Sequence, residues 1–171
     1  MSKTDLDVHF DRIDQLVQEM KAFVPSDLIG ASQFRADLAG LLVVTIAASY
    51  ESCVKETLIA YANRHHIAFG TFTLNNYKKL NSRISISDLH QYSSLFDDNI
   101  AVRFKKILNA RKTKIDQRIG KNIESCYKQI LSWRHDFAHA GTRNTTIEEA
   151  VATHRLAKRV LYSFDQAFNG H

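Results

Sequence analysis

The chain has 171 residues, of which 44% are hydrophobic and 24% charged, and its formal net charge is +5. This composition is that of a globular protein, and the length allows a hydrophobic core without disulfides or metals as staples. A single domain over residues 1–171 is the simplest expectation. One proline and six glycines are too few for the many turns of an all-β fold, so long helices are expected.

Targeting and cofactor signals are weak. The longest apolar run, residues 38–50, is shorter than the roughly 18–20 apolar residues of a membrane-spanning helix, so it is interpreted as a buried core helix. The N-terminus is polar and acidic, unlike a secretory signal. Cys53 and Cys126 stand in no metal-ligand spacing and are expected to be reduced thiols. We therefore expect a cytoplasmic protein without a membrane anchor, metal or other cofactor.

The first half of the chain predicts two long helices. Apolar residues recur at helical spacing over 5–24, and Pro25 ends this helix. A second helix is predicted over 32–66, and because apolar residues nearly encircle its first half, that half should be central. The segment 67–86 mixes strand-like and helical patterns, and it is interpreted as a connecting loop or an insertion.

The second half of the chain also predicts helices, each with its own end signals. Ser87 is expected to cap the first, Gly141 to end the third, and Thr145 with Glu148 to form a capping box for the last. The predicted ranges are 87–96, 97–111, 115–140 and 145–168. The expected fold class is an all-α bundle of four main helices plus shorter ones.

Basic residues gather between Arg103 and Lys128, where nine Lys and Arg accompany only two acids. Phosphate contacts dominate affinity for nucleic acids, so this stretch either binds RNA or is a solvated helix face. His154 and Arg155 are expected on the surface, where Arg155 could extend an RNA-facing rim. The candidate RNA-binding residues are Arg103, Lys105, Lys106, Arg111, Lys112, Lys114, Arg118, Lys121 and Arg143.

The segment 133–141, WRHDFAHAG, holds the densest cluster of titratable side chains. His135 and His139 share a helix face, but no third ligand is evident, which disfavours a metal site. Arg134 and His139 are separated by about 140° on an ideal helix. They would converge only if the helix frays or bends near Gly141, or if a second copy of the chain approaches.

The chemistry of these side chains suits RNA cleavage without a metal. Arginine offers a planar cation that fits phosphate, and histidine exchanges a proton near neutral pH. A base can remove the proton of an RNA 2′-hydroxyl, and a cation can stabilise the charge that develops when this oxygen attacks phosphorus. Asp136 could orient His135 or Arg134, or it could face water. Trp133 is expected to pack the helix against a neighbour or a second subunit.

The stretch RHDFAHAG resembles the R-x4–6-H motif of the HEPN superfamily. Arg134 resembles the motif arginine, His135 the polar residue that follows it, which is most often Asn, and His139 the motif histidine. The resemblance implies an all-α bundle and a metal-independent endoribonuclease. It also implies a homodimer with a composite RNA-cleaving site at its interface, and a toxin–antitoxin or anti-phage setting with a possible antitoxin or defence partner.

The stretch TIAASYESCVKETLIAYANRHH resembles the RiboL-PSP type of HEPN domain. By this resemblance, Glu51 is matched to an acid of the early core helix near the motif, with Arg134 as its expected partner. The other interpretation places Glu51 on an exposed edge of its helix. The alternative to a nuclease is a non-catalytic HEPN-like module that binds RNA or a protein.

Overall fold

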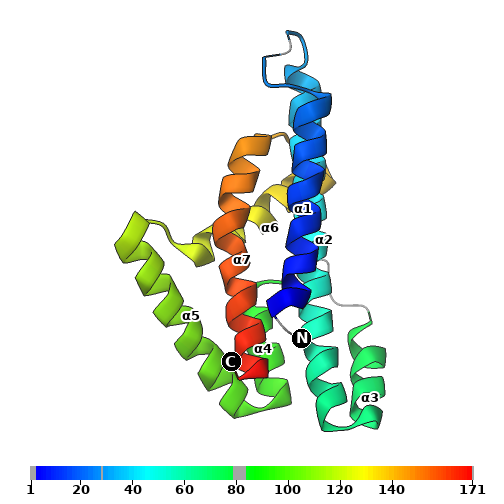
Figure 1. The fold of residues 1–171 in the computed structure, drawn as a ribbon, viewed down its shortest axis with the longest axis vertical. Helices are drawn as coiled ribbons and strands as arrows, with labels where there is room; N and C mark the ends of the chain where they lie inside the picture. Colours follow the sequence, from blue (N-terminus) through cyan, green and yellow to red (C-terminus); the bar gives the residue numbers. More distant parts are fainter. Residues whose placement is uncertain (1–2, 28, 79–83, 171) are drawn as a thin grey trace.

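The structure is a computed structural model that describes residues 3–27, 29–78 and 84–170. Within these residues it contains seven helices and no strand (Figure 1). The helices are α1 (Lys3–Phe23), α2 (Ser32–His65), α3 (Ile67–Tyr77), α4 (Ile86–Phe96), α5 (Asp98–Ile119), α6 (Ile123–Ala140) and α7 (Ile147–Asn169). The predicted all-α fold class is confirmed.

Three helices, α2, α6 and α7, pack against one another, and α1 lies against α2 and α7. Figure 1 shows α1, α2 and α7 along the long axis of the molecule, α3 beside the lower part of α2, and α5 slanting away to one side of α7. The apolar positions that predicted the helices face inward. Phe10 of α1, Leu42 and Ile46 of α2, and Phe164 of α7 are each at most 1% exposed.

The helix α2 is the longest element and the centre of the bundle. By length and composition alone it could cross a membrane, since one 18-residue window has a mean hydropathy of 1.4. The length of the uninterrupted apolar run, on which the sequence prediction was based, did not indicate this. Half of that window is buried inside the protein. Leu42, Val43 and Ile46 have no exposed surface, as predicted for the first half of a core helix.

Residues 67–77 form the helix α3. Of the two interpretations of this segment, a connecting loop or an insertion, the loop is therefore wrong for these residues. His66 begins the helix, because its Nδ1 accepts the Ala68 N–H at 3.1 Å. The helix buries only Gly70 and Thr73, so its sequence shows little of the apolar periodicity by which a helix is predicted. Gly70 allows α3 to fold back closely onto α2, where a Cβ atom would lie 1.6 Å from Asn63 Oδ1. Residues 79–83 of the predicted loop lie outside the described residues.

Two predicted N-caps are displaced by neighbouring residues of the same type. Ser85, not Ser87, caps α4: its hydroxyl accepts the Asp88 N–H at 3.2 Å, and the Asp88 carboxylate accepts the Ser85 N–H at 2.7 Å. Thr146, not Thr145, caps α7 by accepting the Glu149 N–H at 3.1 Å. In each case two hydroxyl residues competed for one cap, and the backbone geometry selected between them.

The boundary between α5 and α6 also differs from the prediction. The helix α5 continues past residue 111 to Ile119 and ends at Gly120, whose φ of 63° favours glycine. Asn122 then begins α6 by accepting the N–H groups of Glu124 and Ser125 at 2.9 and 3.2 Å. Gly120 is a residue type typical of helix ends, and Asn122 is typical of helix starts. The apolar periodicity continued across both residues, so the predicted helix 115–140 included them.

A polar pair lies in the core between α2 and α7. His154 is 1% exposed, which corrects its predicted surface position. Its Nδ1 is hydrogen-bonded to the Tyr50 hydroxyl at 2.9 Å, and its Nε2 has no hydrogen-bond partner in the described part of the chain. Burial, together with the charges of Lys158 and Arg155, lowers the pKa of His154 to about 3. The imidazole is therefore neutral in the folded protein at neutral pH.

This neutral histidine should make the protein less stable in mild acid. Between pH 6.5 and about 3, the unfolded chain binds a proton at His154 that the folded chain does not. Stability is thus lost as the pH falls through this window, by about 2 kcal/mol between pH 7 and pH 5. Urea unfolding at both pH values measures the loss. The control variant Tyr50→Phe/His154→Leu should lose about 2 kcal/mol less over the same interval, and an equal loss would contradict the prediction.

Candidate functional site

The motif residues 134–139 occupy the last turns of α6. The helix stays regular to Ala140, and Gly141 ends it with a φ of 62°. Of the two predicted routes to convergence, the helix therefore shows no fraying before Gly141, and the approach of a second copy stays a prediction. Five residues of regular helix keep the two side chains about 140° apart around the axis, so one chain does not bring them together.

Arg134 is half-buried and lies one residue after the buried Trp133. It makes no hydrogen bond or ion pair with any residue that the structure describes. A guanidinium has five N–H donors, and a partly desolvated cation without an anionic partner is unfavourable. The geometry of Arg134 thus suits an anion that comes from outside the chain, such as a phosphate group.

His135 and His139 lie side by side on the exposed surface of α6. Their ring centroids are 4.5 Å apart, as their spacing of four residues predicted. Among the described residues, no group of three His, Cys, Asp or Glu side chains is placed to hold a metal ion. Both imidazoles are exposed, and each can therefore meet a ligand that approaches the end of α6.

Asp136 is bound to the loop that follows the motif helix. Its carboxylate accepts the Asn144 side-chain N–H at 2.9 Å, and its carbonyl accepts the Thr142 N–H at 3.3 Å. Within the described chain it does not bond to Arg134 or His135. Asp136 therefore fixes the connection between α6 and α7, and a role in orienting a catalytic group stays a prediction.

The opposite side of the motif helix packs closely against α2. Phe137 lies directly over Gly40, where a Cβ atom would come within 2.1 Å of the phenyl ring. Trp133 is 7% exposed, so it packs α6 within its own chain, one of its two predicted roles. These contacts hold the helix that carries Arg134 and His139 firmly against the core.

The register of α2 and α6 separates Glu51 from the motif. Gly40 lies beside Phe137, and Tyr50 stacks on Tyr127 with ring centroids 5.2 Å apart. By this register, Glu51 lies about 12 Å along the helix axis from the level of Arg134. Glu51 instead pairs with Lys55 at 2.5 Å. The expected pairing of Glu51 with Arg134 is therefore wrong, since α2 carries this acid too far from the motif.

A model of the RiboL-PSP-HEPN family matches residues 8–170. The chain belongs to the RiboL-PSP-HEPN family. The resemblance read from the sequence is thereby confirmed, and membership suggests a ribonuclease-type or RNA-binding function. Comparison with curated proteins and with solved structures finds no match.

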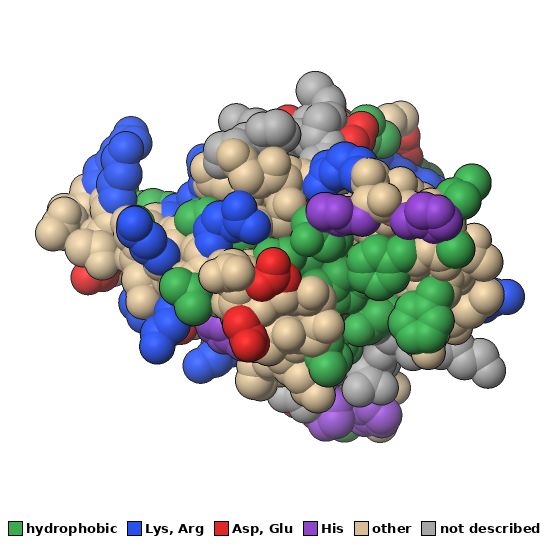
Figure 2. All heavy atoms as spheres, turned by 90° about the horizontal axis from the view of Figure 1, so that it is seen from below, with side chains coloured by type: hydrophobic (Ala, Val, Ile, Leu, Met, Phe, Trp, Pro, Cys, Tyr) green, Lys and Arg blue, Asp and Glu red, His purple; other side chains and the backbone are tan. Residues whose placement is uncertain are grey.

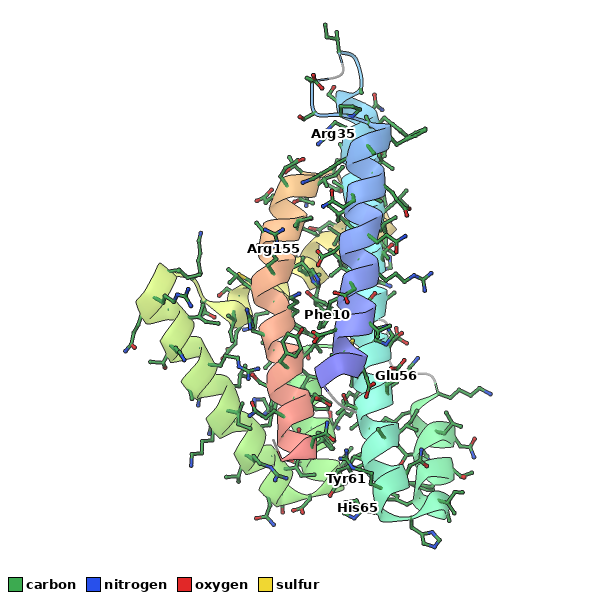
Figure 3. The ribbon with its side chains drawn as sticks, viewed as in Figure 1. Phe10, Arg35, Glu56, Tyr61, His65 and Arg155 are labelled. Carbon is green, nitrogen blue, oxygen red and sulfur yellow. The ribbon has the colours of Figure 1, made fainter. Side chains whose placement is uncertain are left out.

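Two ion pairs that the sequence did not reveal hold the edge of the HEPN motif. Asp37 of α2 binds Arg143 at 2.5 Å, and Arg35 binds Glu148 at 2.8 Å; Figure 3 shows Arg35 at the upper end of α2. Together they tie the α6–α7 loop and the first turn of α7 to the start of α2. The hydrogen bond with Asp37 and its charge raise the pKa of Arg143. Any phosphate would compete with Asp37 for this predicted RNA-binding residue.

The other candidate RNA-binding residues lie mostly on α5. Lys112 pairs with Glu124 at 3.0 Å, and Arg111 is half-buried. Twelve residues of chain, about 18 Å of helix, separate Asn122 at the start of α6 from Arg134. The basic helix and the HEPN motif therefore occupy different parts of the domain. The remaining candidates are exposed: Arg103, Lys105, Lys106, Lys114, Arg118 and Lys121.

Proposed function

We propose that this HEPN domain is a metal-independent endoribonuclease that acts as a homodimer. The observation that carries the proposal is the half-buried Arg134, which has no partner among the described residues, on the same helix end as the exposed His139. About 140° of helix separates the two. A second copy, facing the first across the end of α6, would supply the imidazole that one chain cannot bring to its own arginine.

The proposed reaction uses the RNA itself as the nucleophile. Neutral His139 takes the proton of a 2′-hydroxyl, and the oxygen attacks the adjacent phosphorus while Arg134 stabilises the negative charge. The P–O5′ bond breaks, and a protonated imidazole, from His135 or a second His139, gives its proton to the leaving oxygen. The products are a 2′,3′-cyclic phosphate and a 5′-hydroxyl. Asp136 acts by positioning the loop, and Glu51 makes no contact with this arrangement.

The biological setting is a further part of the proposal, and the family resemblance supports it. A metal-independent ribonuclease of this type suits a bacterial toxin–antitoxin or anti-phage system in the cytoplasm. An antitoxin or defence partner would then restrain cleavage in the uninfected cell. Growth of cells that express the wild type or His139→Ala tests this setting, because arrest should depend on His139.

Cleavage of RNA in the presence of a chelator tests the nuclease. Wild-type protein should cleave several RNAs to products with 2′,3′-cyclic phosphate ends, and His139→Ala should be slower by about 100-fold or more. The matched control is His65→Ala, an exposed histidine that is the last residue of α2, which should keep full activity. Equal, background-level products from the wild type and His139→Ala would reject the nuclease. RNA binding that survives this result would favour the non-catalytic module.

A further inference from the structure

A groove of about 390 Å³ runs between α5 and α7, away from the HEPN motif. Its floor is aliphatic, formed by Ile115, Ile119 and Leu156. Its walls carry positive charge and, among the described residues, no acid. The cations that line it are Arg111, Lys114, Arg118 and Arg159. The α5 members are spaced three to four residues apart, so they share one face of the helix.

The charges of this groove are not neutralised within the chain. Lys114, Arg118 and Arg159 form no ion pair with any acid that the structure describes. The nearby Lys112 differs, because it is paired with Glu124 at 3.0 Å. Three exposed cations that converge without an anion repel one another. An anionic ligand would relieve that repulsion.

Arg111 is held in place at the back of the groove. Its guanidinium donates to the carbonyl of Arg159 at 3.2 Å and to Gln166 Oε1 at 3.0 Å. Two of its five N–H donors are thus fixed by α7, which orients the remaining ones. Burial and the charge of Arg159 lower the pKa of Arg111. The site is therefore preorganised for an anion rather than assembled by mobile side chains alone.

We propose that this groove binds one nucleotide of a single-stranded RNA, with its base on the aliphatic floor and its phosphates on the cations. The groove has the volume of a small-ligand site. Its guanidinium planes can stack on a base, and a duplex would keep the base hidden. The choice of RNA rests on the proposed function. The groove would hold substrate at a distance from the motif. Figure 2 shows Lys and Arg side chains gathered at the left, on the side of the molecule where α5 lies.

Binding by a protein that does not cleave tests the groove separately from the nuclease. In the His139→Ala background, fluorescence anisotropy measures the affinity for a labelled 12-nucleotide RNA. Lys114→Ala/Arg118→Ala should weaken binding about tenfold and reduce the salt dependence by about one to two phosphate contacts. The matched pair Lys105→Ala/Lys106→Ala removes the same charge from exposed residues of α5 outside the groove. It should weaken binding less than about threefold, and equal losses from both pairs would overturn the proposal.

Two further ligands test whether a base enters the groove. An abasic strand of the same length and charge should bind at least about fivefold more weakly, because base stacking is lost. Equal affinity for this strand, or equally tight groove-dependent binding of a duplex or of polyglutamate, would overturn the proposal. A wild type that fails to cleave RNA, combined with groove-dependent binding of the single strand, would reject the nuclease and support the groove.

Discussion

A one-to-one mixture of Arg134→Ala and His139→Ala proteins should regain RNA cleavage that neither variant has alone. The regular helix α6 keeps these two residues about 140° apart in one chain, so in the proposed homodimer a working pair would combine Arg134 of one copy with His139 of the other. In a mixed dimer, one copy retains the arginine and the other retains the histidine. One of the two pairs is then intact.

The size of the recovery follows from the symmetry of the dimer. Random exchange makes half of the dimers mixed, and each mixed dimer has one working pair of two, so about a quarter of the wild-type rate is expected. The measurement is the initial rate on a labelled RNA after subunit exchange. The control is the double variant Arg134→Ala/His139→Ala mixed one-to-one with wild type, in which mixed dimers hold no complementary pair. Its rate should fall during exchange from about half to about a quarter of the wild-type rate, because only the remaining wild-type dimers cleave. If the mixture of Arg134→Ala and His139→Ala proteins does not regain cleavage after complete subunit exchange, a shared site is contradicted.

Gly40→Ala should destabilise the protein by about 2 kcal/mol. Alanine gains about 1 kcal/mol over glycine within a helix, but its Cβ atom would lie 2.1 Å from the ring of Phe137. The two helices must therefore separate or the ring must turn. Since Phe137 lies between Arg134 and His139, the motif helix moves with it. Urea unfolding measures the stability, and we expect cleavage to fall in the variant that remains folded.

A second substitution distinguishes this clash from a general effect on α2. In Gly40→Ala/Phe137→Leu the ring is absent, and the double variant should be more stable than the sum of the two single effects by about 1 kcal/mol or more. The control is Leu41→Ala, because Leu41 is 52% exposed on the same helix and should change stability by less than about 0.5 kcal/mol. Additive effects in the double variant would show that Gly40 and Phe137 do not limit the approach of α2 and α6.

The long helices could be predicted because their apolar residues repeat at the period of a helix. The predicted ranges 5–24 and 32–66 agree closely with α1 and α2. His154 could also have been found, since it stands on the buried stripe of α7 between Val151 and Ala157. As a histidine, residue 154 was predicted to lie on the surface, whereas its position on the buried stripe of α7 favours the core. His154 lies in the core because Tyr50 is hydrogen-bonded to one of its ring nitrogens and burial keeps the ring neutral.

The motif could be predicted because all of its members lie within residues 134–139, which is less than two turns of helix. The contacts around it could not be found in this way. Asp37 and Arg143 are 106 residues apart, and only the packing of α2 against α6 brings them together. The same packing keeps Glu51 away from Arg134, whereas its ion pair with Lys55 is an i, i+4 contact within α2 itself. Arg159 joins the α5 cations only through the contact of α5 with α7, although each residue is an ordinary surface cation in the sequence.

A second surface stayed hidden for the same reason. Figure 2 shows hydrophobic side chains gathered on the lower face of the molecule, at the opposite end from the α6–α7 loop. The helices α3 and α4 lie at this end of the molecule (Figure 1), and Ile67, Phe72 and Leu95 of these helices are each more than 60% exposed. The sequence placed these residues in segments whose apolar patterns were short or mixed. The helix α3 reaches this end of the bundle only because the chain folds back along α2 after His65.

The straight end of α6 has a kinetic consequence. The structure places Phe137 against Gly40 and ends the helix cleanly at Gly141, so the motif has no hinge by which one chain could open or close it. In the proposed enzyme, the concentration of the protein would then control the rate of cleavage. At low expression, where most chains are monomers, the rate would rise with the square of the protein concentration. Halving the dose of protein would cut cleavage about fourfold, which gives a cell a steep threshold without any moving part.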